Sequence, residues 1–495
     1  MKIKHIYLTT AIPYTNANLH IGHAYENILA DFLARYYRQQ GNKVIFQTGT
    51  DDHGLKNYKS AKEEGISTKK FVDKNAKNVE AVFKSISSSH DQFVRTVDSK
   101  KHWPGVQKLW KAISKDLYKK KYTAKYCVGC ERFLLDKEIT KGCCEIHPGK
   151  KLETISEENY FFKLSKYKNK LITLIKTDKY KIQPKAAKNE ILSFLRGKVR
   201  DVSFSREKSR LPWGIPVPGD NNQVIYVWAD ALPNYITGIG YGSNSAKFKK
   251  WWPAQFHIVG KDISRFHAIY WPAMLLSAGL ATPKELLVHG FINDEKGRKM
   301  SKSIGNVIDP FDQINTYDLD TVRYYFLRSI PSNQDGNYSE TDLIDRHNAE
   351  LVNTLGNLLS RSLNLIEKSG GRVPKGKYDV TLKKEYNQAL KKLNESIVNF
   401  DFHHGVAAVW KYISKVNQYV DKTKPWTLDG KKKEKVLYNL AESLRLISAL
   451  TYPIIPNASE EIAKQLGIKK VPLIKSDTIK VGTKINKGKH LFSKI

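Results

Sequence analysis

Residues 5–52 read HIYLTTAIPYTNANLHIGHAYENILADFLARYYRQQGNKVIFQTGTDD and join two strand-like runs through a helical one. The first run, HIYLTTAI, is rich in β-branched residues and predicts a buried strand. Ile28, Phe32 and Tyr36 then recur at helical spacing, and Gly41 ends that helix. The second run, KVIFQTGTDD, predicts another strand, so we expect a β-α-β unit of the doubly wound type.

A similar alternation returns at residues 254–292, where AQFHIVG, DISRFHAIYWPAMLLSAG and KELLVHGFI predict strand, helix and strand. We expect both units to share one parallel sheet of a Rossmann-type α/β domain. Between them, residues 116–224 hold all four cysteines and the string LPWGIPVPGD, which indicates an insertion. Beyond a turn-rich boundary at 331–340, helical periodicity continues to about residue 466 and predicts a helix bundle.

The chain has 495 residues, of which 41% are hydrophobic, so it is long enough for about three domains. We expect six segments along it. In chain order they are the first half of the α/β domain at 1–115, the insertion at 116–224, the second half of the α/β domain at 225–298, a loop and linker at 299–345, an all-α domain at 346–466 and a basic tail at 467–495.

The chain is strongly basic, with 83 Lys and Arg against 49 Asp and Glu, a net charge of +34 and a pI near 9.7. Such an excess favours a polyanionic partner such as nucleic acid, although lysines spread over solvated faces would explain much of it equally well. The start, MKIKHIYLTT, is not a secretory signal, and there is no run of eighteen uncharged apolar residues. We expect a cytoplasmic protein without a membrane anchor.

His20 and His23 stand three residues apart in NLHIGHAYE, where the first helix is expected to begin. A helix N-terminus offers unpaired amides and a partial positive charge, imidazoles add hydrogen-bond donors, and Gly22 lets a ligand approach the backbone. This combination suits a nucleotide. Histidines near helix ends are usually inert, so the pattern alone leaves both interpretations open.

A second cationic segment, GRKMSKS at 297–303, also follows a predicted strand and should reach the same carboxyl edge of the sheet. Lys299 and Lys302 can place positive charge on a triphosphate, while Ser301 and Ser303 can donate hydrogen bonds. Attack on an α-phosphate builds negative charge that such cations stabilise. The alternative is a surface lysine run, which the pairing with the two histidines disfavours.

The HIGH and KMSKS segments, in this order on this framework, resemble the class I aminoacyl-tRNA synthetases. The strings AIPYTNANLHIGHAYE, TGTDDHG, WGIPVPGD, YVWADAL, GKDISRFHAIYWPAM and HGFINDEKGRKMSKS are together similar to the methionyl-tRNA synthetases, over essentially the whole chain. The resemblance implies methionine–tRNA ligase activity, in which methionine and ATP give methionyl-adenylate and tRNA(Met), initiator tRNA included, accepts the methionyl group. It also implies that 299–345 carries the KMSKS loop and that 346–466 binds the anticodon.

Two rival interpretations stay open. A leucine, isoleucine or valine ligase of the same class usually carries a much larger editing insertion. A non-catalytic RNA-binding paralogue would explain the charge and the helical half, but it should have lost motif residues that are intact here.

A methionine site needs an anion for the ammonium group and an apolar, partly aromatic cup for the polarizable thioether. Without the resemblance, Trp228 and Tyr235 would be ordinary core aromatics. The resemblance implies that Asp51 binds the amine and that the pocket also contains Ile12, Tyr14, Trp228, Ala231, Leu232, Tyr235, Ile263 and His267. It assigns ATP binding to His20, Gly22, His23, Glu26, Lys261, Asp262, His289, Lys299 and Lys302, with His20, His23, Lys299 and Lys302 as catalytic residues.

Two positions depart from the family pattern. Asp52 stands where relatives commonly carry Glu, and we expect the shorter acid to be tolerated. Val202 stands where Trp is usual, and we expect a change in local packing only.

Cys127 and Cys130 form a CxxC, and Cys144 and His147 have the same two-residue gap. Two such pairs suit the four ligands of tetrahedral zinc, and the resemblance to the single-knuckle form of the family's insertion implies one structural Zn2+. A redox CxxC would need thioredoxin-like surroundings, which are lacking. A remnant without metal is the alternative, and Cys143 is a spare thiol or an alternative ligand.

Asn357 and Arg361 lie one helical turn apart in VNTLGNLLSR, and Trp426 ends VNQYVDKTKPW. An amide and a guanidinium can read base edges, and an exposed indole can stack on an unpaired base. The resemblance implies that these residues recognise the anticodon; alone they would be surface polar residues and a packing Trp. We further expect Mg2+ with ATP, although no carboxylate pair for it is evident, and a monomer, because the extra C-terminal module of dimeric relatives is lacking.

Overall fold

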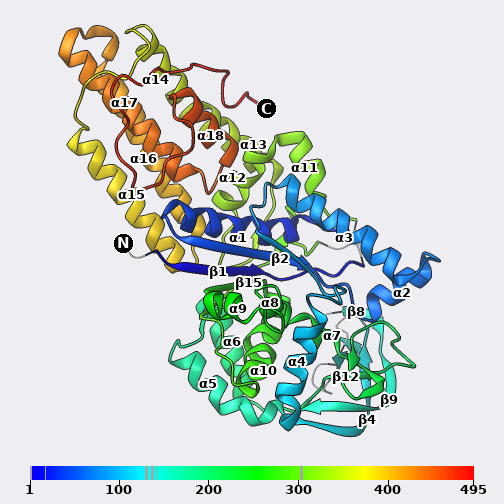
Figure 1. Cartoon of the computed structure of the whole chain (residues 1–495). Coiled ribbons are helices and arrows are strands. Elements are labelled where there is room, and N and C mark those ends of the chain that lie inside the picture. Colours follow the sequence, from blue (N-terminus) through cyan, green and yellow to red (C-terminus); the bar gives the residue numbers. More distant parts are fainter. Residues whose placement is uncertain are drawn as a thin grey trace.

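The computed structural model describes residues 3–16, 18–128, 132–134, 139–140, 142–145, 147–300 and 305–495, with the backbone alone at 132–133 and 147–150. A six-stranded parallel sheet lies at its centre, between a helical domain at one end and a β-rich insertion at the other (Figure 1). The strand order is β10-β16-β15-β1-β2-β3. These strands are β1 (His5–Thr10), β2 (Lys43–Thr50), β3 (Gln92–Arg95), β10 (Lys181–Gln183), β15 (Phe256–Gly260) and β16 (Glu285–His289).

The two predicted strand-helix-strand units do share one sheet. In the first, α1 (Ile21–Gln39) connects β1 to β2, which pair in parallel from His5↔Lys43 to Thr9↔Gln47. In the second, β15 pairs with β16, and the Leu8↔Phe256 register places β15 directly beside β1. The chain therefore winds in opposite directions from the boundary between β1 and β15, and this reversal creates a crevice at the carboxyl edge.

Helices cover both faces of this sheet, and the apolar residues of the strands alternate between them. Ile6 and Leu8 belong to a core with α1 and α3 (Thr68–Ser85), whereas Val259 and Val288 pack with the helices of the opposite face. The helices of that face include α4 (Trp103–Ile113), α8 (Asn234–Thr237) and α10 (Trp271–Ser277) (Figure 1). The other helices in this part of the chain are α2 (Leu55–Glu63), α5 (Lys168–Lys176), α6 (Lys185–Arg196), α7 (Val227–Ala231) and α9 (Ser245–Trp251).

The helix predicted at 262–279 is divided. A 3-10 turn, η4 (Lys261–Ile263), is followed by a π-helical stretch, η5 (Phe266–Tyr270), and then by α10. Pro272 lies in the first turn of α10, and because it lacks an amide hydrogen it cannot make the regular hydrogen bond to the preceding turn. The wider π turn, a feature common at functional sites, therefore ends where the regular helix begins.

The insertion is built on an antiparallel ladder between β4 (Leu117–Cys127) and β9 (Glu153–Phe162). β10, although it lies within the predicted insertion at 116–224, pairs with β16 in the central sheet. A three-residue strand is too short to show a period in the sequence. The small strands of this region are β5 (Arg132–Phe133), β6 (Ile139–Thr140), β7 (Cys143–Cys144), β8 (His147–Lys151), β11 (Val202–Ser203), β12 (Ser205–Glu207), β13 (Pro216–Val217) and β14 (Asp220–Ile225).

The helical domain and α1 contribute side chains to one hydrophobic core, so the two halves of the molecule are packed together. Before it, β17 (Ile292–Asn293) pairs with β18 (Gly336–Asn337). The helices of the linker and of the helical domain are, in chain order, α11 (Pro310–Tyr317), α12 (Leu319–Ser329), α13 (Glu340–Arg346), the π-helical η6 (His347–Gly356), α14 (Asn357–Glu367), α15 (Val380–Val398), α16 (Phe402–Thr423), the 3-10 turn η7 (Pro425–Thr427), α17 (Gly430–Thr451) and α18 (Pro456–Gln465).

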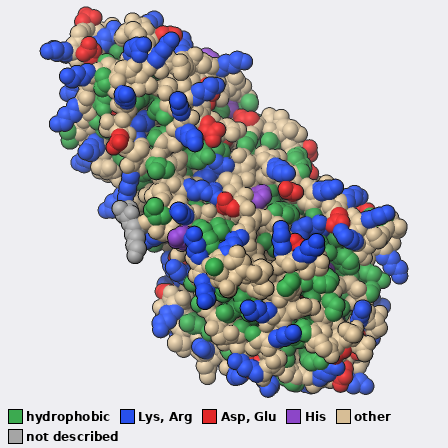
Figure 2. All heavy atoms as spheres, viewed as in Figure 1, with side chains coloured by type: hydrophobic (Ala, Val, Ile, Leu, Met, Phe, Trp, Pro, Cys, Tyr) green, Lys and Arg blue, Asp and Glu red, His purple; other side chains and the backbone are tan. Residues whose placement is uncertain are grey.

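The basic tail at 467–495 packs along this domain. Ile474, Ile479 and Ile485 are buried, and the Ile474 amide donates to the Gln39 carbonyl at the end of α1. Within the described residues, no helix combines the length and apolarity needed to cross a bilayer. Figure 2 shows Lys and Arg spread over both domains on the visible face, without one dominant patch.

Candidate active site

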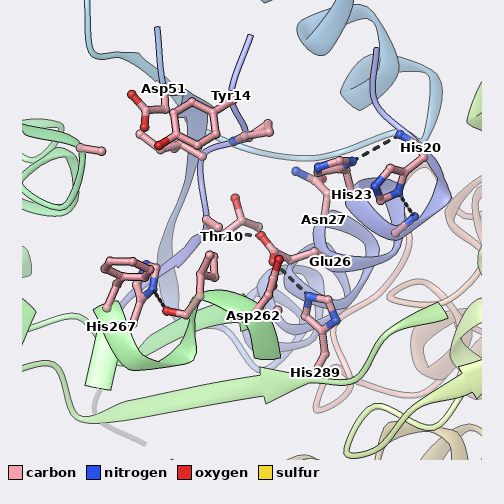
Figure 3. Close-up of a pocket in the computed structure, with 18 of the residues that line it drawn as sticks. Thr10, Tyr14, His20, His23, Glu26, Asn27, Asp51, Asp262, His267 and His289 are labelled. Carbon is pink, nitrogen blue, oxygen red and sulfur yellow. Dashed lines mark hydrogen bonds and ion pairs between the residues drawn. The ribbon is translucent and has the colours of Figure 1, made fainter. Parts of the chain in front are cut away.

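A cavity of about 410 Å3 lies at the carboxyl edge of the sheet, at the ends of the neighbouring strands β1 and β15, where the strand order reverses. Ligands of doubly wound sheets bind at this point of reversal. Its wall is formed by the residues after β1, β2, β15 and β16, by the start of α1, and by α7 and α8. Figure 3 shows Asp51 and Tyr14 on one side and the two histidines of α1 on the other.

The two predicted histidines lie together at the start of α1, with ring centroids 4.1 Å apart. His20 is the N-cap, and its Nδ1 accepts from the Gly22 amide at 3.1 Å, while the His20 amide donates to His23 Nδ1 at 3.3 Å. Because each Nδ1 accepts, each ring carries its proton on Nε2. Burial, then the neighbouring imidazoles of His20 and His289, lower the pKa of His23 to about 3, so His23 is a neutral hydrogen-bond donor.

Gly22 has a local reason to be glycine. A Cβ at this position would lie 2.8 Å from His20 Cε1. The absence of a side chain therefore lets the His20 ring fold back over the first turn of α1, which adds to the ligand access expected from the sequence.

Glu26 connects the ends of two strands across the crevice. One carboxylate oxygen accepts from the Ala11 amide at 2.8 Å, and the other lies 3.0 Å from His289 Nε2 (Figure 3). His289 Nδ1 donates to the Gly290 carbonyl. Burial opposes protonation of His289, but the hydrogen bond and charge of Glu26 outweigh it and raise the pKa of His289.

Asp51 directly follows β2 and is buried beside the segment that follows β1. The two segments meet through the Asp51 amide, which donates to the Pro13 carbonyl at 2.9 Å, and the Thr15 amide, which donates to the Asp51 carbonyl. The Thr96 hydroxyl donates to Asp51 Oδ1 at 3.4 Å. The cavity thus receives a fixed anion next to Tyr14.

An aromatic cup lines the cavity beside this anion. The Trp228 ring stacks on Phe266 at 3.7 Å with an interplanar angle of 6°, and it meets His267 edge-on. The Tyr235 hydroxyl donates to His267 Nε2 at 2.7 Å, since His267 Nδ1 donates to the Ile263 carbonyl. Burial lowers the pKa of His267 to about 4, so the cup is uncharged at neutral pH.

All nine residues that are predicted to bind methionine line this cavity. Seven of the nine residues that are predicted to bind ATP also line it. Lys299 is among them, and its ammonium lies 4.5 Å from the centroid of the Phe291 ring. Lys261 is not among the lining residues, and its ammonium lies 2.5 Å from Asp335 Oδ2. Lys302, Ser301 and Ser303 fall outside the described residues. The roles of these residues stay predictions.

Phe266 and Asn27 are two of the lining residues that the sequence did not predict. Phe266 forms the stack with Trp228, and the helical spacing of its segment gave no sign of which residues face the sheet edge. Asn27 is 1% exposed and lines the cavity, yet neither atom of its amide has a hydrogen-bond partner among the described residues. Buried amides are normally paired, so Asn27 is suited to a bound polar ligand.

The two positions that depart from the family pattern are accommodated locally. The Asp52 carboxylate is buried and lies 3.1 Å from Arg95 Nε, although burial raises its pKa. Its carbonyl accepts from Trp213 Nε1. Val202 lies in β11, paired with Phe162 at the margin of the insertion sheet.

For the zinc prediction, the structure describes part of the ligand set. Cys127 and Cys144 are both buried in one small cluster with Leu134, although they come from the separate strands β4 and β7. Cys144 and His147 are backbone partners across the next hairpin. The side chains of His147 and Cys130 lie outside the described residues. Two buried thiols in one cluster fit the soft donors that zinc prefers.

The three predicted anticodon residues lie at one region of the helical domain. Asn357 and Arg361 are one turn apart on α14, and Arg361 lies 2.7 Å from Asp421 near the end of α16. Trp426 follows five residues later in η7 and is 54% exposed. The indole is therefore available for stacking, while Arg361 has an acidic neighbour that RNA would have to displace.

Comparison with known proteins agrees with this geometry. The family model for class I tRNA synthetases, in its methionine form, matches residues 6–151 and 144–363, and the model for the anticodon-binding domain of tRNA ligases matches 379–485. A methionine–tRNA ligase from Caldanaerobacter subterraneus is 42% identical, covering 99% of this chain and 79% of that one. The chain belongs to the methionyl-tRNA synthetase family.

Other members of the methionyl-tRNA synthetase family are similar over most of their length. The methionine–tRNA ligase of Brucella suis is 40% identical over 93% of this chain and 92% of its own. The crystal structure of Mycobacterium tuberculosis methionyl-tRNA synthetase in complex with methionyl-adenylate superposes with a TM-score of 0.93 at 34% identity, covering 99% of this chain and all of that one. The predicted fold, a parallel-sheet α/β domain followed by a helical anticodon-binding domain, is thus confirmed.

Proposed function

We propose that this protein activates methionine with ATP and transfers it to the 3′ end of tRNA(Met), including the initiator tRNA. The proposal is supported by one cavity that is lined by groups suited to both substrates. The buried Asp51 and the neutral aromatic cup line it, and so do the histidines of α1 and Lys299. One side suits an amino acid with a thioether, and the other suits a nucleotide.

Methionine binds on the side of the cavity that contains Asp51 and the aromatic cup. The ammonium group lies against Asp51, whose position is set by backbone hydrogen bonds to the segment after β1. The sulfur enters the cup of Trp228, Tyr235 and His267. Because His267 is neutral, the thioether meets polarizable, uncharged groups, which suits a sulfur atom better than a hydrated cation would.

ATP binds on the side that contains the histidines of α1 and Lys299, and the adenylate forms there. The methionine carboxylate attacks the α-phosphorus of ATP, a carboxyl–phosphate bond forms, and the bond to pyrophosphate breaks. His20 and His23 donate hydrogen bonds from Nε2, and Lys299 and Lys302 stabilise the negative charge that develops on the phosphates. Mg2+ accompanies ATP. No side chain has to form a covalent intermediate, so catalysis rests on positioning and charge.

In the transfer step, a hydroxyl of the terminal adenosine of tRNA attacks the acyl carbon and AMP leaves. Asn357, Arg361 and Trp426 would contact the anticodon loop, the first two at base edges and the indole by stacking. One Zn2+ held by Cys127, Cys130, Cys144 and His147 would stabilise the insertion without taking part in the reaction. We place the reaction in the cytoplasm and the protein as a monomer.

Methionine-dependent exchange of pyrophosphate into ATP tests this proposal. The purified protein should catalyse exchange with methionine and much less with leucine, isoleucine or valine, and it should then charge tRNA(Met). Exchange driven by a branched aliphatic amino acid would point to another ligase of the class. RNA binding without any exchange would point to a non-catalytic paralogue.

A further inference from the structure

The Lys261 ammonium is held by a residue from a distant part of the chain. Its Nζ lies 2.8 Å from Oδ1 and 2.5 Å from Oδ2 of Asp335, which belongs to the linker between α12 and α13. The resemblance assigned Lys261 to ATP, yet in this structure the ammonium is turned to a carboxylate. No motif in the sequence singles out Asp335.

The same carboxylate binds the rim of the cavity. Asp335 Oδ1 also accepts from the Phe291 amide at 2.8 Å, and Phe291 lines the cavity. The Phe291 ring has two ammonium groups near it, that of Lys261 at 4.3 Å from the ring centroid and that of Lys299 at 4.5 Å. Asp335 thus contacts both Lys261 and the backbone of the rim residue whose ring lies near the two ammonium groups.

Main-chain contacts keep Asp335 in place. A Cβ on Gly290 would lie 2.2 Å from the carbonyl of Gln334, so the two backbones touch. Ile292 and Gly336 are partners in the β17–β18 pair. At the start of the linker, the Ser332 hydroxyl donates to the Phe400 carbonyl. The linker is therefore fixed on both sides of Asp335, and the carboxylate would stay when Lys261 moves.

We propose that Asp335 is a positioning residue that competes with the phosphates of ATP for Lys261. The inference rests on the proposed function. The side chains of Lys261 and Asp335 are 41% and 40% exposed, and ion pairs with this exposure are weak enough to exchange. The free enzyme keeps Lys261 neutralised beside Asp335, and a bound triphosphate, with its higher negative charge, draws the ammonium across the Phe291 ring.

Pyrophosphate exchange at varied ATP tests this competition in the full chain. Asp335→Asn keeps an oxygen for the Phe291 amide and removes the charge. It should lower the KM for ATP by about two- to fivefold, the size of an exposed ion pair, while kcat and the KM for methionine stay within about twofold. Lys261→Gln should raise the KM for ATP, and adding Asp335→Asn to it should have no further effect.

Asp178→Asn is the matched control, because Asp178 forms an exposed pair with Lys188 at 2.7 Å and should leave the KM for ATP unchanged. A higher KM for ATP in Asp335→Asn, or an equal effect of that change with and without Lys261, would overturn the proposal. If Asp335→Asn fails to fold, an unchanged KM for ATP in Lys261→Gln overturns it instead. A wild type without methionine-dependent exchange refutes the proposed function, a different outcome that is seen before any variant is compared.

Discussion

The Arg323 guanidinium of α12 lies 2.8 Å from the Asp31 carboxylate of α1, and neither side chain is exposed. Arg35 approaches the same carboxylate at 2.7 Å. Arg323 also donates to the carbonyls of Ile454 and Ile86, which belong to the helical and α/β halves respectively. This buried pair therefore connects the helix that begins at the two cavity-lining histidines to the helical domain.

Loss of this pair should destabilise the protein strongly. Arg323→Met leaves Asp31 buried beside Arg35 alone and removes the hydrogen bonds to the carbonyls, so the free energy of unfolding should fall by about 3–5 kcal/mol. Urea denaturation measures it. Lys464→Met, which removes an exposed pair with Glu461, should cost less than about 1 kcal/mol. Equal losses in the two variants would contradict the structural role of Arg323.

Stability should fall below pH 6.5 because of His267. Its pKa is about 4 in the folded protein and near 6.5 when unfolded, so between these values the unfolded chain binds the proton and the folded one does not. Stability from this group is present above pH 6.5 and is lost as the pH falls toward 4, by up to about 3 kcal/mol.

His267→Gln should therefore have a flatter profile of unfolding free energy between pH 7 and 4 than the wild type. His23, whose pKa is also lowered, contributes to both profiles and cancels in the difference. The exposed His490→Gln is the control and should follow the wild type. Parallel profiles of wild type and His267→Gln would show that His267 is not held neutral by burial.

Zinc should be bound in a one-to-one ratio and should depend on Cys127. Cys127→Ser removes a buried ligand, so metal analysis should find little zinc in the variant and its melting temperature should fall. Cys143→Ser should retain the metal, since Cys143 is not among the four proposed ligands. Zinc-free wild type from a metal-replete preparation, or loss of zinc in Cys143→Ser, would contradict the ligand set.

Trp426 should separate the two half-reactions. Trp426→Ala removes an indole that is 54% exposed, so the KM for tRNA(Met) should rise by about 10- to 100-fold, the size of one lost base stack, while pyrophosphate exchange stays unchanged. Val398→Ala, which truncates an exposed apolar side chain at the end of α15, is the control. A drop in pyrophosphate exchange activity would contradict this role, because it would show that Trp426 supports the structure of the protein and does not act by contacting tRNA.

The central sheet was predictable because its signals are local. Ile28, Phe32 and Tyr36 repeat within one helix, and the runs around them are strand-like. β10 was missed because three residues carry no period. The tail gave no pattern either, because its structure comes from contacts with remote backbone, such as the Val373 amide donating to the Thr483 carbonyl.

In the candidate site too, features with a local sequence signal were predictable and features that depend on remote contacts were not. His20 and His23 could be singled out because they stand at the start of a predicted helix, whereas Asp51 was implied by the family resemblance. Asn27 and Asp335 were missed, since an orphan amide and an ion pair 74 residues apart in sequence exist only in three dimensions. The expected contact of Lys261 with ATP differs from its observed partner for the same reason.

A crystal structure with methionine and a non-hydrolysable ATP analogue would show whether one cavity binds both substrates. We expect both ligands in the cavity at the carboxyl ends of β1 and β15, with the ammonium on Asp51, the sulfur in the cup of Trp228, Tyr235 and His267, and the phosphates within hydrogen-bond distance of His23 Nε2. Asn27 should gain a polar partner. Ligands bound elsewhere, with this cavity left empty, would show that the cavity is not the substrate site.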